Sequence, residues 1–184
     1  MTGKTDVMDT EFVYVYDPRG LLTDMTATGT GGETYSVTNV YDVEGILGSV
    51  TDNDNLITYT PDNLGRITGI TYEIDRMSAD TAAYSTAYTY TPGDKVESIL
   101  YPGATNVVNY GYNNKGLLNE IEGFTNPGSI TYNDRMGLEG LTMVNGVSTS
   151  FTYDNSGRLY TAKSLTPGGS EILDRTFGYD GTDN

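Results

Sequence analysis

A short motif returns along almost the whole chain of 184 residues and limits what the chain can fold into. Its fullest form is Tyr-Asp-x-x-Gly-x-Leu at residues 16–22, with close copies at 41–47, 112–118 and 153–159. Weaker copies fill the gaps, one with an extra residue at 132–138, and an eighth opens at Tyr179. The glycine position serves as an anchor, and successive anchors are 20 to 29 residues apart (20, 45, 65, 94, 116, 137 and 157). This period indicates an array of stacked units rather than one closed globule.

Each copy of the motif predicts a β-hairpin. An alternating Tyr-x-Tyr often precedes the turn, and residues two apart on a strand face the same side. An Asp or Asn that opens a turn bonds the backbone ahead of it, and glycine suits the last position of a type I turn followed by a bulge. The residues that define these turns are Tyr16, Asp17, Gly20, Tyr41, Asp42, Gly45, Asp62, Gly65, Tyr112, Asn113, Gly116, Tyr153, Asp154 and Gly157.

Apolar residues follow each anchor at two fixed distances. One stands two places after it, such as Leu22, and another five places after it, such as Met25. A gap of three breaks the alternation of a regular strand. Either a bulge intervenes or the two rows face opposite sides of the sheet, and the sequence leaves both possibilities open.

A second, looser turn links each unit to the next. Asn126-Pro127-Gly128 is one example, and Val144-Asn145-Gly146-Val147 predicts a type I′ hairpin. Residues 75–83 have helical propensity for about two turns and are interpreted as an insertion in a connection. Residues 1–12 are expected to be a lead-in. Residues 13–184 are expected to hold about seven repeats, or about fourteen strands in an antiparallel meander, with an eighth repeat truncated at the C-terminus.

Composition excludes several classes of function. The chain has no His and no Cys, so the usual Ser-His-Asp and Cys-His sets, disulfides and zinc ribbons cannot form. Its net charge of −15 argues against binding nucleic acid or an anionic membrane. No window resembles a membrane span or a signal peptide. We therefore predict a protein that is not an enzyme and that uses no cofactor or metal.

The repeat resembles the YD repeat, also called the RHS repeat, over residues from about Val13 to Asn184. That family includes RHS polymorphic toxins, wall-associated proteins, toxin-complex subunits and teneurin-like adhesion proteins. The resemblance implies an all-β fold in which antiparallel β-hairpin repeats form a curved or spiralling, shell-like sheet. It also implies an exported parent with an extracellular or cell-surface location. The C-terminal sequence does not match the self-cleaving core motif of the toxins, and both ends resemble cuts in a longer array.

The expected role is a non-catalytic structural segment, part of a β-shell or stalk that encloses or presents another domain. Its partners would be neighbouring repeats of the same parent, other copies through open sheet edges, a C-terminal effector cargo, or glycans. The alternative is a carbohydrate-binding or adhesion module. Its ligand surface would use tyrosines outside the fixed repeat position, namely Tyr35, Tyr72, Tyr84, Tyr101 and Tyr160.

Three further groups of side chains have competing interpretations. The repeated tyrosines predict packing between neighbouring hairpins, although a platform for sugar rings is the other possibility. Asp52-Asn53-Asp54-Asn55 carries oxygen ligands of the kind that Ca²⁺ prefers, but turn chemistry explains it without a metal. Basic residues in or beside the turns predict salt bridges from one repeat to the next along a rim: Arg19, Arg66, Lys95, Lys115, Arg135 and Arg158.

Overall fold

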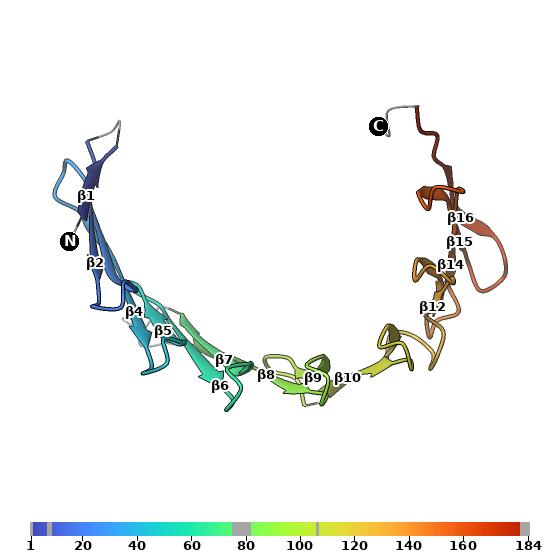
Figure 1. The fold of residues 1–184 in the computed structure, drawn as a ribbon, viewed down its shortest axis with the longest axis horizontal. Coiled ribbons are helices and arrows are strands. Elements are labelled where there is room, and N and C mark those ends of the chain that lie inside the picture. Colours follow the sequence, from blue (N-terminus) through green and yellow to red (C-terminus); the bar gives the residue numbers. More distant parts are fainter. Residues whose placement is uncertain (1, 7–8, 75–81, 106, 181–184) are drawn as a thin grey trace. The chain divides into compact units, whose positions relative to one another are not determined.

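The structure is a computed structural model that describes residues 2–6, 9–74, 82–105 and 107–180 (Figure 1). Within these ranges the regular secondary structure is β-strand, which confirms the predicted all-β class, and no helix there is long and apolar enough to cross a membrane. The strands are β1 (Thr2–Thr5), β2 (Glu11–Tyr16), β3 (Leu22–Thr28), β4 (Thr34–Tyr41), β5 (Leu47–Thr51), β6 (Leu56–Pro61), β7 (Ile67–Ile74), β8 (Ala82–Tyr90), β9 (Val96–Leu100), β10 (Val107–Tyr112), β11 (Leu118–Ile121), β12 (Thr131–Tyr132), β13 (Leu138–Thr142), β14 (Ser148–Tyr153), β15 (Leu159–Leu165) and β16 (Glu171–Thr176).

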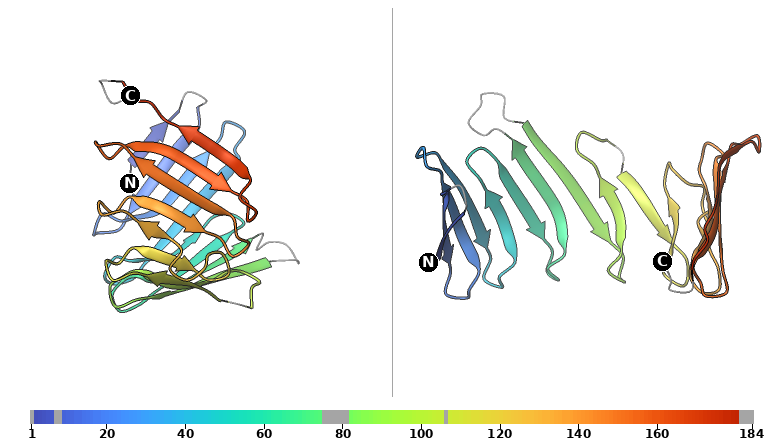
Figure 2. Two further views of the ribbon diagram at one scale, coloured as in Figure 1. Left: turned by 90° about the vertical axis from the view of Figure 1, so that its right-hand side faces the viewer. Right: turned by 90° about the horizontal axis from the view of Figure 1, so that it is seen from above.

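The chain divides into two compact units. The first comprises Met1–Thr89 with Ile99–Val107, and the second comprises Tyr90–Ser98 with Val108–Asn184. In the first unit β1 to β8 pair antiparallel in chain order. In the second, β10 pairs with β11, and β12 to β16 pair antiparallel in chain order. Figure 2 shows the hairpins of each unit lying side by side, which is the predicted meander.

The turns that carry the motif share one geometry. In the turn that opens at Asp17, the Gly20 N–H donates to the Asp17 carbonyl and the Asp17 N–H donates to the Leu21 carbonyl, both at 2.9 Å. The Asp17 Oδ1 also accepts from the backbone N–H groups of Arg19 and Leu21. The same two backbone bonds recur in the described turns that open at residues 42, 62, 91, 113, 133 and 154. Each turn is therefore closed by the backbone and by its first side chain.

The anchor position does not require glycine in every repeat. In the sixth turn the Met136 N–H donates to the Asn133 carbonyl, and Met136 has a φ of 64°. The anchor assigned to Gly137 was therefore wrong by one residue, and this copy has no extra residue. Asp94 has a φ of 59° at the same position of the fourth turn. The surrounding turn holds both residues in a conformation that side chains ordinarily avoid.

A bulge after each turn settles the question that the sequence left open. Tyr16 is paired with Leu22 and Val15 with Asp24, so Thr23 is an additional residue in β3. The same register shift recurs beside the turns that open at 42, 62, 113, 133 and 154. Because Met25 is paired with Tyr14, both apolar rows lie on the face that carries the Tyr-x-Tyr pair.

Two local predictions need correction or lie outside the described ranges. The type I′ prediction at 144–147 was wrong, because Gly146 has a positive φ of 84° while Asn145 does not. Gly146 N–H donates to the Met143 carbonyl and Met143 N–H to the Val147 carbonyl, which is the geometry of the motif turns. The helical prediction for 75–83 falls on residues 75–81, which are outside the described ranges, while Ala82 and Ala83 belong to β8.

Burial in both units is shallow. The most buried described residues, Thr125, Ala162, Ile130 and Ser98, retain 6–8% of their exposure. A globular domain of this length ordinarily encloses fully buried side chains. These strands are instead stabilised mainly by their immediate neighbours, as in other repeat proteins. Contacts between successive repeats therefore determine the stability of the array.

Candidate functional site

The most regular feature of the structure is a set of five hydrogen bonds, each of which joins a repeat to the one before it. The hydroxyl of the motif tyrosine donates to the carbonyl of the apolar residue that stands two places after the preceding anchor. We call this set the tyrosine seam. The bonds are Tyr41 to Leu22 (3.1 Å), Tyr112 to Val96 (2.7 Å), Tyr132 to Leu118 (2.8 Å), Tyr153 to Leu138 (2.7 Å) and Tyr179 to Leu159 (2.8 Å).

The seam depends on the bulge. Four of the five accepting carbonyls belong to the first residue after the turn, where the strand register shifts: Leu22, Leu118, Leu138 and Leu159. A bulge locally disrupts the ladder and re-aims nearby groups, so the position suits an acceptor for a side chain of the next repeat. Burial raises the pKa of the half-buried Tyr112 hydroxyl above its ordinary 10.0.

The third repeat departs from the seam and offers a test of it. Pro61 is paired with Ile67 in the place where Tyr41 is paired with Leu47, so the motif tyrosine is replaced by proline. We expect Pro61→Tyr to be more stable than Pro61→Phe by about 1 kcal/mol, because only the hydroxyl can donate to the Leu47 carbonyl. Urea denaturation of the two variants measures this difference. Equal stabilities would show that the tyrosine position contributes only ring packing.

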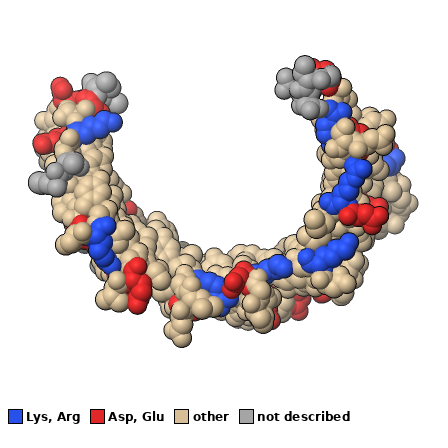
Figure 3. Space-filling view, viewed as in Figure 1, with Lys and Arg blue, Asp and Glu red and all other residues tan. Residues whose placement is uncertain are grey.

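Basic side chains form two kinds of contact around the turns. Arg19, Arg66 and Arg158 pair with the carboxylate that opens their own turn, at 2.8, 2.7 and 2.9 Å respectively. The prediction of salt bridges from repeat to repeat was therefore wrong for these three, because the arginine and the aspartate lie within one short turn. Figure 3 shows basic and acidic side chains interspersed along the viewed edge of each unit.

Contacts from one repeat to the next use carbonyls and rings instead. Arg19 Nη1 donates to the carbonyls of Asp42 and Val43 in the next turn, at 2.7 and 3.1 Å. Arg135 Nη1 donates to the Asn155 carbonyl at 3.0 Å. The Arg158 guanidinium lies 4.5 Å from the centre of the Tyr179 ring, which is a favourable cation–π distance. The cations thus reinforce the seam along the same rim.

Hydrogen bonds stabilise the ionised form of the Asp154 and Asp62 carboxylates. The backbone N–H of Arg158, with the Arg158 side chain and the Ser156 N–H, lowers the pKa of Asp154 from its ordinary 3.8. The Arg66 side chain, with the N–H groups of Arg66 and Leu64, does the same for Asp62. Each N–H stabilises the charged carboxylate more than the neutral acid.

These pKa shifts predict a sensitivity to acid. A carboxylate whose pKa is lower in the folded chain adds stability above its ordinary pKa, and that stability is lost as the pH falls through the folded value. We expect the free energy of unfolding to be nearly constant from pH 7 to about 5 and to decline below about pH 4. Denaturation at a series of pH values measures it. Asp154→Asn should decline less steeply, because an amide oxygen accepts the same turn bonds at Asn113 and Asn133 without titrating. A stability that rises toward pH 3 would contradict this account.

The tyrosines expected to form a ligand surface are all substantially exposed, but they do not all lie together. Tyr72 is paired directly with Tyr84 across β7 and β8 in the first unit. Tyr35, in β4, shares the face of Val37 and Met25, which is the seam face. Tyr101 lies in the connection after β9, whereas Tyr160 occupies a bulge position in β15 of the second unit. The structure therefore pairs Tyr72 with Tyr84 in the first unit, whereas Tyr160 belongs to the second unit.

The acidic turn beside Tyr35 is already satisfied by the protein. Asp52 Oδ1 accepts from the N–H groups of Asp54 and Asn55 at 2.9 and 2.6 Å, and the Asn55 amide donates to both carboxylate oxygens. The Asn55 amide, followed by these N–H groups, lowers the pKa of Asp52. Over the described residues no group of three or more Asp and Glu side chains is placed to hold a metal ion. Turn chemistry therefore accounts for this cluster.

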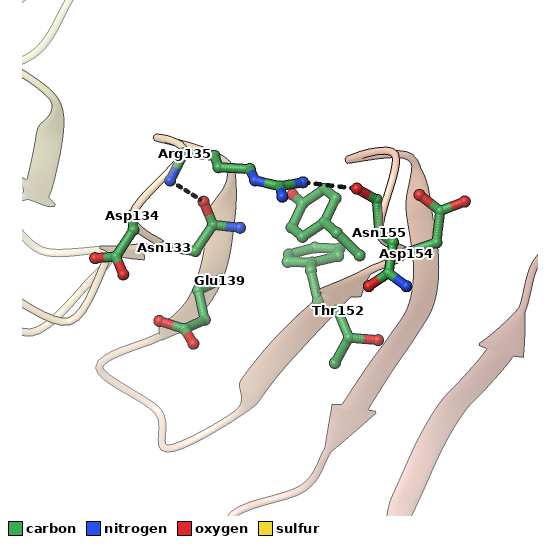
Figure 4. A pocket seen from close by; sticks show the side chains of 9 residues that line it. Asn133, Asp134, Arg135, Glu139, Thr152, Asp154 and Asn155 are labelled. Carbon is green, nitrogen blue, oxygen red and sulfur yellow. Dashed lines mark hydrogen bonds between the residues drawn. The ribbon is translucent and has the colours of Figure 1, made fainter.

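Shallow grooves lie between successive turns of the second unit. One groove of about 370 Å³ is shown in Figure 4, where Arg135 extends toward the Asn155 carbonyl. A second, of about 280 Å³, lies one repeat earlier. Asn133, Arg135 and Tyr153 of the first groove correspond in the repeat to Asn113, Lys115 and Tyr132 of the second. A groove that recurs with the repeat is a consequence of stacking the turns.

Comparison with known proteins reveals the fold but no sequence relative. No protein-family model matches the sequence, and no curated protein matches it. Two solved structures match 99% of this chain with a TM-score of 0.81 each, at 14% and 13% identity. They are a Photorhabdus luminescens Tc holotoxin pore, with the mutation TccC3-D651A, and a TcdB2-TccC3-TEV crystal structure. This chain has the fold of a segment of those Tc toxin chains. It spans about a tenth of the length of the chains it matches, 10% in each case.

This structural similarity confirms the resemblance to the YD-repeat family at the level of the fold. Sequence reasoning had identified the repeat tyrosines but not the atoms they contact. Asn39 is a further seam residue that was missed, since its amide donates to the Leu22 carbonyl at 2.9 Å beside the Tyr41 hydroxyl. Asn39 stands two places before Tyr41. Other repeats of this chain carry a different residue at that position, such as Tyr14 and Tyr110. No spacing signal in the sequence marked it.

Proposed function

We propose that this chain is a structural segment of a larger exported or surface protein of the YD-repeat type, forming part of a β-wall that encloses or presents another domain. The observation that carries the proposal is the tyrosine seam, which repeats one contact from repeat to repeat at five places. A wall needs neighbour-to-neighbour contacts of this kind, whereas an enzyme needs a unique site. The similarity to Tc toxin chains adds support for a repeat segment within a larger toxin-like assembly.

The proposed partners follow from this role. Neighbouring repeats of the same parent contact the chain along the strand edges, and an effector cargo lies behind the wall. The parent is expected outside the cell, because the solved structures with a similar fold are toxins. The net charge of −15 suits solubility of a sheet with many exposed side chains.

The enclosing role is tested on the longer polypeptide by limited proteolysis. We expect the enclosed domain to resist protease while the seam is intact and to become at least tenfold more sensitive after Tyr112, Tyr132 and Tyr153 are changed to Phe. Equal sensitivity of that domain before and after the change would contradict enclosure by this segment. So would the finding that cells produce and release the 184-residue chain alone.

A carbohydrate-binding or adhesion role is a second candidate because exposed tyrosines face one another in the first unit. Tyr72 and Tyr84 are directly paired, at 36% and 48% exposure, and such rings stack on sugar faces. Glycan-array binding that is lost in Tyr72→Ala with Tyr84→Ala, but kept in Tyr160→Ala, would support this role. A glycan array that shows no binding would contradict the carbohydrate-binding role.

A further inference from the structure

Tyr72 and Tyr84 lie directly opposite each other on the adjacent antiparallel strands β7 and β8. Side chains at such positions share one face of the sheet and have Cβ atoms about 5 Å apart. Tyr59, by contrast, is paired with the aliphatic Ile70. The register of β7 with β8 therefore holds two phenol rings within reach of each other.

Both of these phenol rings are open to solvent. Tyr72 is 36% and Tyr84 is 48% exposed. A seam tyrosine such as Tyr112 is half-buried instead, and its hydroxyl is committed to a backbone carbonyl, that of Val96. An exposed side chain changes rotamer within picoseconds to nanoseconds, so the rings of Tyr72 and Tyr84 can meet and an oxidant can reach them.

Tyrosine is the residue of this chain that is suited to an oxidative cross-link. The chain has no cysteine, so no disulfide can join its strands, but it has 16 tyrosines. A phenol that loses one electron and one proton becomes a phenoxyl radical, and two such radicals combine through ring carbons next to the oxygen. A ring fixed on the next strand acts like a partner at an effective concentration of about millimolar or more, which favours coupling within one molecule.

We propose that Tyr72 and Tyr84 form a modification site, at which a haem peroxidase and hydrogen peroxide join the two rings as dityrosine. Each phenol loses one electron and one proton, and the two radicals form a carbon–carbon bond between their ortho positions. The hydrogen on each of those carbons then moves to the oxygen and restores the hydroxyl. The peroxide takes up two electrons and two protons and becomes two molecules of water. The inference does not depend on the proposed enclosing or carbohydrate-binding role.

Tyr35 is a competing partner for Tyr72. Burial, the charge and hydrogen bond of Asp52, and the Tyr72 charge all raise the pKa of the Tyr35 hydroxyl, so the two tyrosines belong to one neighbourhood. The Tyr35 hydroxyl, however, donates to Asp52 Oδ2 at 3.3 Å, and β4 lies three strands from β7. Three strand spacings amount to about 14 Å, so Tyr84 on the adjacent strand is the favoured partner.

Oxidation of the dilute, folded chain with a haem peroxidase and hydrogen peroxide tests the proposal. The monomeric fraction is digested with trypsin, which cleaves after Lys and Arg and separates residues 67–76 from residues 77–95. Tyr72 is the only tyrosine of the first peptide, and Tyr84 lies in the second. Mass spectrometry detects a joined peptide that is two hydrogen atoms lighter than the sum of the two, and dityrosine fluorescence verifies the bond.

We expect this joined peptide to be the main product within one molecule. Tyr72→Phe should abolish it, and Tyr84→Phe should lower its yield at least about tenfold, because the other tyrosines of residues 77–95 are not opposite Tyr72. Tyr160→Phe is the matched control and should leave the yield unchanged. Tyr160 is 49% exposed, but it occupies a bulge position with no residue paired to it in the register of β14 with β15.

Circular dichroism verifies that each variant keeps the β-sheet spectrum. The absence of the joined peptide from the oxidised chain would overturn the proposal. An equal yield in Tyr84→Phe, or a main product that joins Tyr72 to Tyr35, would also overturn it.

Discussion

Replacing Tyr112, Tyr132 and Tyr153 together with phenylalanine should lower the free energy of unfolding of the second unit by about 3 kcal/mol. Each change removes one hydroxyl whose hydrogen bond to a carbonyl measures 2.7 or 2.8 Å, and a bond of this kind contributes about 1 kcal/mol. The rings remain, so packing is nearly preserved. The three sites belong to different repeats, and their effects should add approximately. Urea denaturation followed by circular dichroism measures the loss.

The control removes three hydroxyls that do not belong to the tyrosine seam. Tyr72, Tyr84 and Tyr160 are each more than a third exposed, and changing them to phenylalanine should alter the same free energy by no more than about 0.5 kcal/mol. A loss of similar size in both triple variants would show that hydroxyl groups matter for solubility or the unfolded chain, and that the tyrosine seam does not stabilise the array.

Gly157→Val should cost about 2 kcal/mol of stability. Gly157 has a φ of 83°, and a β-branched residue is strongly disfavoured in the left-handed region. Space is not the obstacle, because the nearest atom to an added Cβ is Arg135 Nη1 at 3.8 Å. The expected loss therefore measures backbone conformation, and thermal denaturation should show a lower midpoint.

Met136→Gly is the matched opposite change at the same position of the preceding turn. Met136 holds a φ of 64° with a side chain that is 61% exposed, so glycine relieves strain without removing much packing. We expect a gain of about 0.5–1 kcal/mol, since the relief of about 1–2 kcal/mol is partly offset by the flexibility of glycine in the unfolded chain. A destabilised Met136→Gly together with a neutral Gly157→Val would contradict the assigned turn geometry.

The sequence was sufficient to predict the hairpin array, because the spacing of Asp, Gly and Tyr reflects local chemistry. Asp17 accepts hydrogen bonds from backbone N–H groups within four residues of itself, so the local sequence is enough to predict its role in the turn. The anchor at Met136 was not readable. Glycine is the usual residue at positive φ, so the anchor of this repeat was assigned to Gly137. In the structure the closed turn imposes a positive φ on Met136, one residue earlier.

Contacts between repeats were harder to predict than the repeats themselves. A bulge decides which carbonyl the next tyrosine reaches, and a three-residue gap between apolar positions did not distinguish a bulge from a change of face. The arginines show the same limit. Arg19 donates to Asp17 of its own turn and to the backbone carbonyls of the following turn. The sequence spacing did not show that its carboxylate partner lies within the same turn rather than in the next one.

The most direct test of the structural role is a cryo-EM map of the proposed longer protein. We predict that residues 13–180 form consecutive hairpins of a continuous β-wall, with each tyrosine of the seam against the preceding repeat and with another polypeptide on one side of the wall. A map in which these residues stand apart as an isolated sheet, with no polypeptide enclosed or presented beside them, would contradict the account.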